Sequence, residues 1–235
     1  SEADMLPTIR SRVRRVGLKV PAIEEVARIL IERDGIDSKL AHQVAAEAQS
    51  HIGMARRLAT SSEARSRRRE TLMAALAISG VTSAVNTAER WLEIAKKDAE
   101  ALTAERDEEE KTAMMRSLGL QPGDAIPANL KSDLRALEEG QKRRATRSVR
   151  DGLDRILVDL LSLYRDVLTL QISANVSLVN EDLRGGITEV SGLSTAAETI
   201  HKLEAIAEAR IRIDSNVRDL MVLESLAVQL RRKTN

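Results

Sequence analysis

The chain has 235 residues, of which 43% are hydrophobic and 1% aromatic, and its 37 basic and 36 acidic residues leave a net charge of +1. Because the sequence contains no cysteine, a disulfide framework, a thiolate zinc site and a cysteine nucleophile are excluded. A molecule with so little net charge does not attract polyanions as a whole, so any basic site must be local.

The spacing of structure-breaking residues favours an all-α fold. The chain has only 4 prolines and 11 glycines, so long uninterrupted elements are expected, and the low aromatic content disfavours a β-sandwich or barrel. No apolar run approaches the roughly 18 residues of a membrane helix, and the N-terminus lacks a signal-peptide pattern. We therefore expect a soluble, cytoplasmic protein without a membrane partner. Because the chain starts at Ser1 without an initiator methionine, we also expect a fragment.

The first part of the chain predicts one short strand and three short helices. Polar and apolar residues alternate over 15–20, which is the only credible strand. Apolar residues then recur at helical spacing until Gly35 ends a first helix, Asp37 can cap a second, and Gly53 precedes a third. Together they predict a three-helix domain over 21–62.

A shift in composition predicts a domain boundary near residues 61–66, where an arginine-rich segment precedes a larger apolar series. A second, helical domain is predicted over 65–235. It contains a long helix from Thr82 to about Leu118, and then the clearest loop of the chain at residues 121–127.

The longest apolar pattern lies over residues 153–168 and predicts a helix at the heart of a bundle. The face opposite its apolar stripe is expected to carry Asp154, Arg155, Ser162 and Arg165. Two pairs with i,i+4 spacing, Arg150 with Asp154 and Asp151 with Arg155, are expected to stabilise this helix slightly.

Three glycines, a predicted helix start and one capping pattern delimit the last predicted helices. Turns are expected at Gly185, Gly186 and Gly192, and Ser194 or Thr195 is expected to start the next helix. The pair Asn216 and Asp219 resembles a capping box that opens the final helix.

The sequence holds no recognisable catalytic constellation. It has neither a G-x-x-x-x-G-K-[ST] phosphate loop nor a G-x-G-x-x-G motif, so no nucleotide site of its own is expected. His42, His51 and His201 lack metal-ligand spacing and are interpreted as surface or structural residues. The acidic residues of 105–110 point in different directions on a helix and are interpreted as a solvated face, not as a metal site.

Arginines are concentrated in two regions for which phosphate is the natural counterpart. The first region holds Arg56, Arg57, Arg65, Arg67, Arg68 and Arg69. A solvated basic face is an equally open interpretation of its second half, because no aromatic residue is present there to stack on bases. For the second region, which contains Arg143, Arg144, Arg147 and Arg150, a solvated face is the favoured interpretation.

Several segments of the chain match motifs of a known protein family. Residues 6–13, LPTIRSRV, are similar to the LPTIRSRC segment near the end of the ATPase-fold (AAA+) base domain of bacterial clamp-loader subunits, in particular the delta prime family in its actinobacterial form. Residues 53–59 are similar to the sensor-2 helix of the small lid domain, and residues 157–166 resemble a collar segment. The final collar helix is matched by Asn216, Leu220, Leu223, Glu224 and Leu226.

The resemblance implies a domain assignment and a set of partners. Residues 1–20 would be the end of the base domain, 21–62 the lid, and 65–235 the collar through which loader subunits associate. The implied partners are the gamma/tau and delta subunits, with the sliding clamp and primed DNA contacted through the complex. The implied role is that of a non-catalytic subunit of the polymerase III holoenzyme, with no cofactor on this fragment and ATP bound by a neighbouring subunit.

The resemblance also implies roles for individual residues. Ser11 and Arg12 match the family's Ser-Arg-Cys motif, so Arg12 is the candidate arginine finger, although Val13 replaces the cysteine. Arg56 falls at the sensor-2 position. Without the resemblance, Arg12 is interpreted as a salt-bridged arginine at a helix end. Two other functions stay open: a helical scaffold or adaptor without a nucleotide role, and a helical nucleic-acid-binding module that uses the arginines of 65–69.

Overall fold

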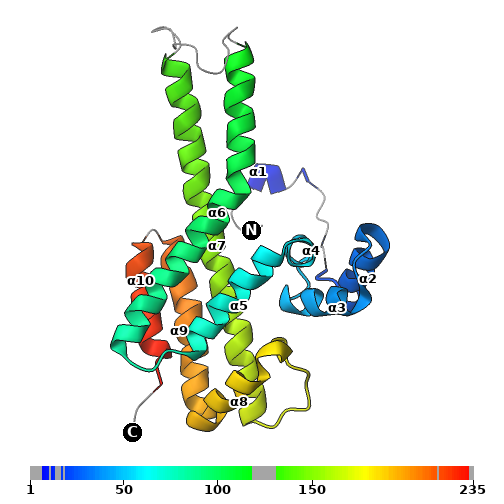
Figure 1. Cartoon of the computed structure of the whole chain (residues 1–235), viewed down its shortest axis with the longest axis vertical. Helices are drawn as coiled ribbons and strands as arrows, with labels where there is room; N and C mark the ends of the chain where they lie inside the picture. The colour runs from blue at the N-terminus through cyan, green and yellow to red at the C-terminus, as the bar shows by residue number, and fades with distance from the viewer. Residues whose placement is uncertain are drawn as a thin grey trace. The chain divides into compact units, whose positions relative to one another are not determined.

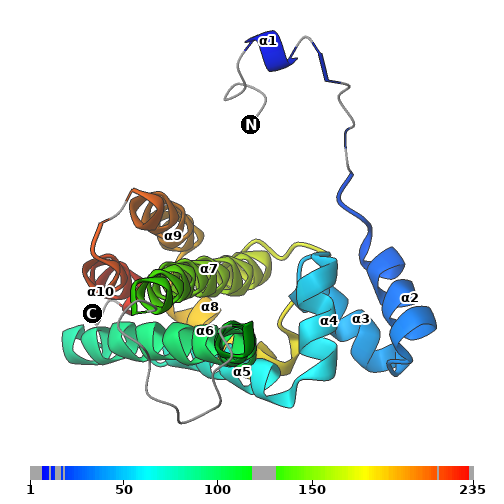
Figure 2. The ribbon, with the colours of Figure 1, turned by 90° about the horizontal axis from the view of Figure 1, so that it is seen from above.

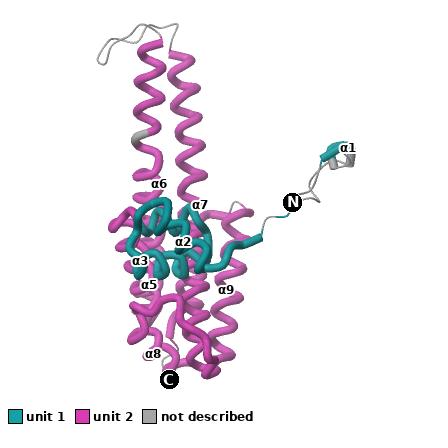
Figure 3. Tube along the Cα trace, turned by 90° about the vertical axis from the view of Figure 1, so that its right-hand side faces the viewer, with its two compact units in different colours: residues 1–59 teal, residues 60–235 magenta. Residues whose placement is uncertain are grey.

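The computed structural model describes residues 7–10, 12–13, 17, 19–117, 131–215 and 217–232. All regular structure within these ranges is helical, which confirms the all-α prediction. The strand predicted over 15–20 lies partly outside the described residues, and Lys19 and Val20 are in no strand. The chain divides into two compact units, residues 1–59 and 60–235, which Figure 3 colours separately.

The first unit is built from α1 (Pro7–Arg10), α2 (Ile23–Asp34), α3 (Ser38–Glu47) and α4 (Ile52–Thr60) (Figure 1). The predicted cap at Asp37 is confirmed, because its Oδ2 accepts a hydrogen bond from the backbone N–H of Leu40 at 3.1 Å. Gly35 ends α2 in the left-handed conformation with φ of 66°. Helix α4 starts before Gly53, and the ring Nδ1 of His51 accepts the backbone N–H of Met54 at 3.1 Å in its first turn.

The second unit contains the longer helices. These are α5 (Ser62–Leu76), α6 (Val81–Ser117), α7 (Lys131–Gln171), η3 (Glu181–Leu183), α8 (Arg184–Leu193), α9 (Ala196–Asp214) and α10 (Asp219–Leu230). Helices α6, α7, α9 and α10 form a closed four-helix arrangement in which each packs on the next, as Figure 2 shows from above. Helix α5 packs on α6 and α7, and α8 packs on α7 and α5.

Aliphatic side chains and the two aromatic residues fill the core of the second unit. Trp91 of α6 is fully buried, and its indole N–H donates to the backbone oxygen of Thr71 on α5 at 3.2 Å. Helices α6 and α7 approach closely at Gly152, where an added Cβ would lie 3.4 Å from both the Cβ and the backbone oxygen of Ala95. A small residue on each helix therefore sets their spacing.

The α6–α7 pair continues beyond the four-helix core as an antiparallel arm (Figure 1). The core reaches Ala99 on α6 and Gly152 on α7, and beyond them no described side chain of the two helices is buried. The arm is held partly by polar contacts, because Arg144 of α7 pairs with Asp107 of α6 at 2.8 Å and with Glu110. Ion pairs between helices thus replace an apolar core along the arm.

The structure corrects two predictions on α7 and its pairing. Ser162 is buried and not on the exposed face, and its hydroxyl donates to the backbone oxygen of Asp159 at 2.7 Å. Asp154 accepts from Arg210 of α9 at 2.7 Å, so an interhelical ion pair stands where the pair with Arg150 was expected. The sequence spacing identified a helical neighbour but not the competing partner on α9.

The turns predicted at Gly185, Gly186 and Gly192 are wrong, because all three glycines lie inside α8. A Cβ at Gly186 would lie 2.8 Å from Cδ1 of Leu76, so this glycine permits close packing of α8 on α5. The helix start at Thr195 is confirmed as a capping box with Glu198.

The last helix does not start as predicted. Its N-cap residue is Arg218, without a side-chain cap, whereas Asn216 lies outside the described residues. The loop predicted over 121–127 also lies outside them.

Candidate functional site

The candidate arginine finger lies in a turn directly after α1. The backbone N–H of Arg12 donates to the carbonyl of Ile9 at 2.9 Å, and Arg12 is exposed. Ser11 lies outside the described residues. An exposed guanidinium at this position has the access that a contact with another molecule requires.

Arg56, at the sensor-2 position, is engaged within the first unit. Its Nη2 lies 3.1 Å from Oδ1 of Asp34, which is the last residue of α2. The carboxylate is largely buried, whereas 54% of the Arg56 side chain is exposed. The ion pair connects α4 to the end of α2, so Arg56 has a structural role within the first unit.

The arginine-rich segment of α5 is engaged in ion pairs inside the second unit. Three consecutive residues point to three different elements, because successive side chains on a helix are about 100° apart. Nε of Arg67 lies 2.8 Å from Oδ1 of Asp98 on α6, and Arg69 pairs with Asp182 on η3.

Arg68 lies between these two arginines and is 8% exposed. Its Nε donates to Oδ1 of Asp159 on α7 at 2.9 Å, and its Nη2 donates to Oδ1 of Asn180 at 2.6 Å. Arg65, one turn before Arg69, is half-buried. Most of the positive charge that suggested a phosphate contact is therefore neutralised by carboxylates of the same unit.

A buried polar cluster continues from Arg68 into the connection between α7 and η3. Asp166 of α7 is fully buried, and its carboxylate accepts the backbone N–H groups of Val179 at 3.0 Å and of Asn180 at 2.7 Å. The side-chain amide of Asn180 also donates to Asp166 at 2.9 Å. The cluster fixes the connection by satisfying its backbone donors, which explains why a carboxylate lies in the core.

Sequence reasoning missed this cluster, although a signal was present. Asp159 and Asp166 are seven residues apart, which places them on one face of a helix, next to apolar residues of the same stripe. An acidic residue that recurs within an apolar stripe indicates a buried partner of opposite charge or a set of donors.

The histidines and the acidic stretch have local partners. Nδ1 of His42 lies 2.7 Å from the carbonyl of Ser38, and His201 pairs with Glu204 at 3.2 Å. Asp107 and Glu110 do not belong to a purely solvated face, since both bind Arg144 across the arm. No group of three metal-ligating side chains occurs in the part of the chain that the structure describes.

The second basic region is divided between the arm's interior and its surface. Arg144 points toward α6, whereas Arg143 is largely exposed and lies 3.8 Å from Glu139 on its own helix. No helix among the described residues has a stretch both long and apolar enough to cross a membrane.

Comparison with known proteins gives one relative and no family model. The chain is 34% identical over 80 residues, or 34% of its length, to DNA polymerase III subunit delta' of Bacillus subtilis (strain 168). The matched part covers 23% of that protein. No protein-family model and no solved structure matches the chain. The comparison therefore supports a clamp-loader-like relationship for part of the chain.

Proposed function

We propose that the chain is the carboxyl-terminal part of a delta prime-type subunit of a bacterial clamp loader. The observation that carries the proposal is the local similarity to delta' of B. subtilis, joined to the LPTIRSR segment at residues 6–12. This segment precedes the three short helices α2, α3 and α4 and then the larger helical unit, which is the order that the resemblance implies.

In this proposal the second unit holds the subunit in the loader. Its partners are the gamma/tau and delta subunits, and the sliding clamp and primed DNA are reached through the assembled complex. The ion pairs of Arg67, Arg68 and Arg69 support this role, because they stabilise the helical unit itself and leave little of that charge for direct DNA binding.

Arg12 acts on ATP that a neighbouring subunit binds. A guanidinium placed on the γ-phosphate stabilises the charge that develops in the transition state and accelerates hydrolysis by about 10³-fold or more. The exposure of Arg12 supports this role. Hydrolysis is thereby coupled to the arrangement of the subunits, although this chain contributes no bond chemistry of its own.

The test is a loader assembled with the intact subunit carrying Arg12→Ala, Arg12→Lys or the control Arg28→Ala. Arg28 is an exposed arginine of α2 in the same unit. We expect Arg12→Ala to assemble normally but to lower clamp loading on primed DNA by at least about tenfold. Arg12→Lys is expected to recover only part of the activity, because an ammonium lacks the planar fork of a guanidinium.

The outcomes separate the competing functions. Unchanged clamp loading by the Arg12→Ala complex removes the arginine-finger role. Failure of the wild-type subunit to assemble with gamma/tau and delta contradicts the whole proposal and favours a scaffold with other partners. Loss of activity in Arg28→Ala equal to that in Arg12→Ala shows an unspecific effect of charge and also rejects the finger.

A further inference from the structure

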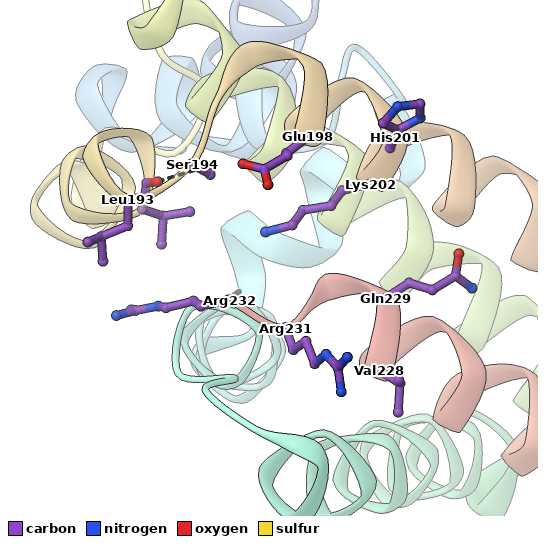
Figure 4. Close-up of a pocket in the computed structure, with 10 residues that line it drawn as sticks. Leu193, Ser194, Glu198, His201, Lys202, Val228, Gln229, Arg231 and Arg232 are labelled. Atoms are coloured by element: carbon purple, nitrogen blue, oxygen red, sulfur yellow. Dashed lines mark hydrogen bonds between the residues drawn. The ribbon is translucent and has the colours of Figure 1, made fainter. Parts of the chain in front are cut away.

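A pocket of about 340 Å³ lies at one end of the second unit, where the end of α8, the first turns of α9 and the end of α10 converge (Figure 4). Its apolar wall includes Leu193 of α8 and Val228 of α10. The volume is at the lower end of the range for small-molecule sites, about 300–1,000 Å³. No sequence motif pointed to this place, and the proposed function makes no use of it.

Most of the charged side chains that line the pocket are cationic. The lining contains Lys202, Arg231 and Arg232 but only one carboxylate, that of Glu198. Lys202 is 8% exposed, and its ammonium lies 5.4 Å from the centre of the Tyr164 ring. Figure 4 shows its side chain extending from α9 into the space between α9 and the end of α10. The charge thus lies in the wall of the pocket and not in bulk solvent, where it would be screened.

Arg232 is held in place by the surrounding elements. Its Nη1 lies 2.7 Å from Oε1 of Glu189, and its Nη2 donates to the carbonyl of Leu76 at 2.7 Å. Its Nε is buried and has no hydrogen-bond acceptor in the part of the chain that the structure describes. The contacts with Glu189 and Leu76 fix the orientation of the Arg232 guanidinium at the pocket.

We propose that this pocket binds a small organic acid with a carboxylate head and a short aliphatic body. The carboxylate pairs with the cationic side chains, since Arg and Lys both donate charge-assisted hydrogen bonds to it. The aliphatic body lies against Leu193 and Val228. The pocket is too small for a large cofactor, and its apolar wall distinguishes an organic acid from an inorganic anion.

The test follows backbone amide signals of the 235-residue chain by NMR during titration with sodium hexanoate. Hexan-1-ol, which lacks the charge, and inorganic phosphate, which lacks the aliphatic body, serve as comparison probes at equal ionic strength. We expect saturable shifts confined to residues 190–202 and 228–232 with hexanoate, and at least about fivefold weaker binding of the other two probes.

A pair of variants on α10 tests the charge. Arg231→Gln changes an exposed residue at the pocket, and Arg218→Gln makes the same change at the exposed N-cap of α10, at the other end of the helix. We expect Arg231→Gln to weaken hexanoate binding by about fivefold and Arg218→Gln to leave it unchanged. Non-saturable or dispersed shifts, equal effects of the two variants, or binding of hexan-1-ol or phosphate as tight as that of hexanoate would each overturn the proposal.

Discussion

Replacing Arg68 by methionine isolates the buried ion pair that joins α5 to α7. Methionine keeps most of the apolar stem of the side chain and removes the guanidinium. The hydrogen bonds that are lost include the 2.9 Å bond to Asp159 and the 2.6 Å bond to Asn180. Asp159 keeps its charge in a site where 12% of its side chain is exposed.

The expected loss of unfolding free energy follows from this burial. Removing one partner of a buried ion pair costs about 3–5 kcal/mol. The neighbouring Arg69 provides a matched control, because its pair with Asp182 lies at the surface, with 51% and 32% of the two side chains exposed. Surface pairs contribute about 0–1 kcal/mol, so Arg69→Met is expected to cost less than about 1 kcal/mol.

The assay is urea unfolding monitored by tryptophan fluorescence. Trp91 is the only tryptophan and is buried in the second unit, so its signal reports on that unit alone. We expect a lower midpoint for Arg68→Met at an unchanged slope, and partial recovery when Asp159→Asn removes the charge of the former partner as well. A cost below about 1 kcal/mol, or equal costs for Arg68→Met and Arg69→Met, would refute the assignment of a buried stabilising pair.

Three further predictions concern other parts of the chain. Gly35→Ala is expected to lower the stability of the first unit by about 1–2 kcal/mol, because φ of 66° is unfavourable for alanine. Hydrogen exchange of the α2 amides measures the loss of stability, and unchanged protection of these amides would contradict the prediction. Hydrogen bonds from Arg144 and Arg106 lower the pKa of Glu110. The stability that ionised Glu110 gives to the arm is therefore complete above the pKa of an ordinary glutamate, about 4.3, and is lost as pH falls through the lowered value. An NMR titration of the Glu110 carboxyl should show this low midpoint in the wild type and a rise toward the ordinary value in Arg144→Gln; identical midpoints in the two proteins would show that the arm's ion pairs do not form. Burial raises the pKa of Tyr164, the only tyrosine, despite an opposing effect of Arg232. The stability of the folded chain is therefore expected to decline above the pKa of an exposed tyrosine, about 10. Tyrosinate absorbance should appear only together with unfolding. Reversible ionisation of the folded chain near that pH would contradict the burial.

The helical fold could be predicted from local patterns because those patterns carry their own physical cause. The long apolar series of α6 and α7, the Asp37 cap and the helix start at Thr195 all depend on a few neighbouring residues of sequence. The glycines of α8 wrongly predicted turns, since packing on Leu76 and not backbone flexibility explains Gly186. Such a requirement depends on a residue that is distant in the chain.

The candidate site residues also differ in whether neighbouring residues in the sequence are enough to predict their surroundings. A local motif indicates Arg12 as a candidate, but no local pattern shows that Arg68 is buried, because its partners lie 91 and 112 residues away in the sequence. A run of arginines looks the same whether it faces phosphate or the protein's own carboxylates. Only the positions of Asp98, Asp159 and Asp182 distinguish the two cases.

The most direct test of the central claim is the association of this chain with loader subunits. Sedimentation velocity compares the chain alone with a mixture that contains the gamma/tau and delta subunits from the same organism. We predict that the chain moves into a single, faster-sedimenting complex at micromolar concentration. An unchanged sedimentation coefficient of the chain in the presence of both subunits would contradict its assignment to a clamp loader.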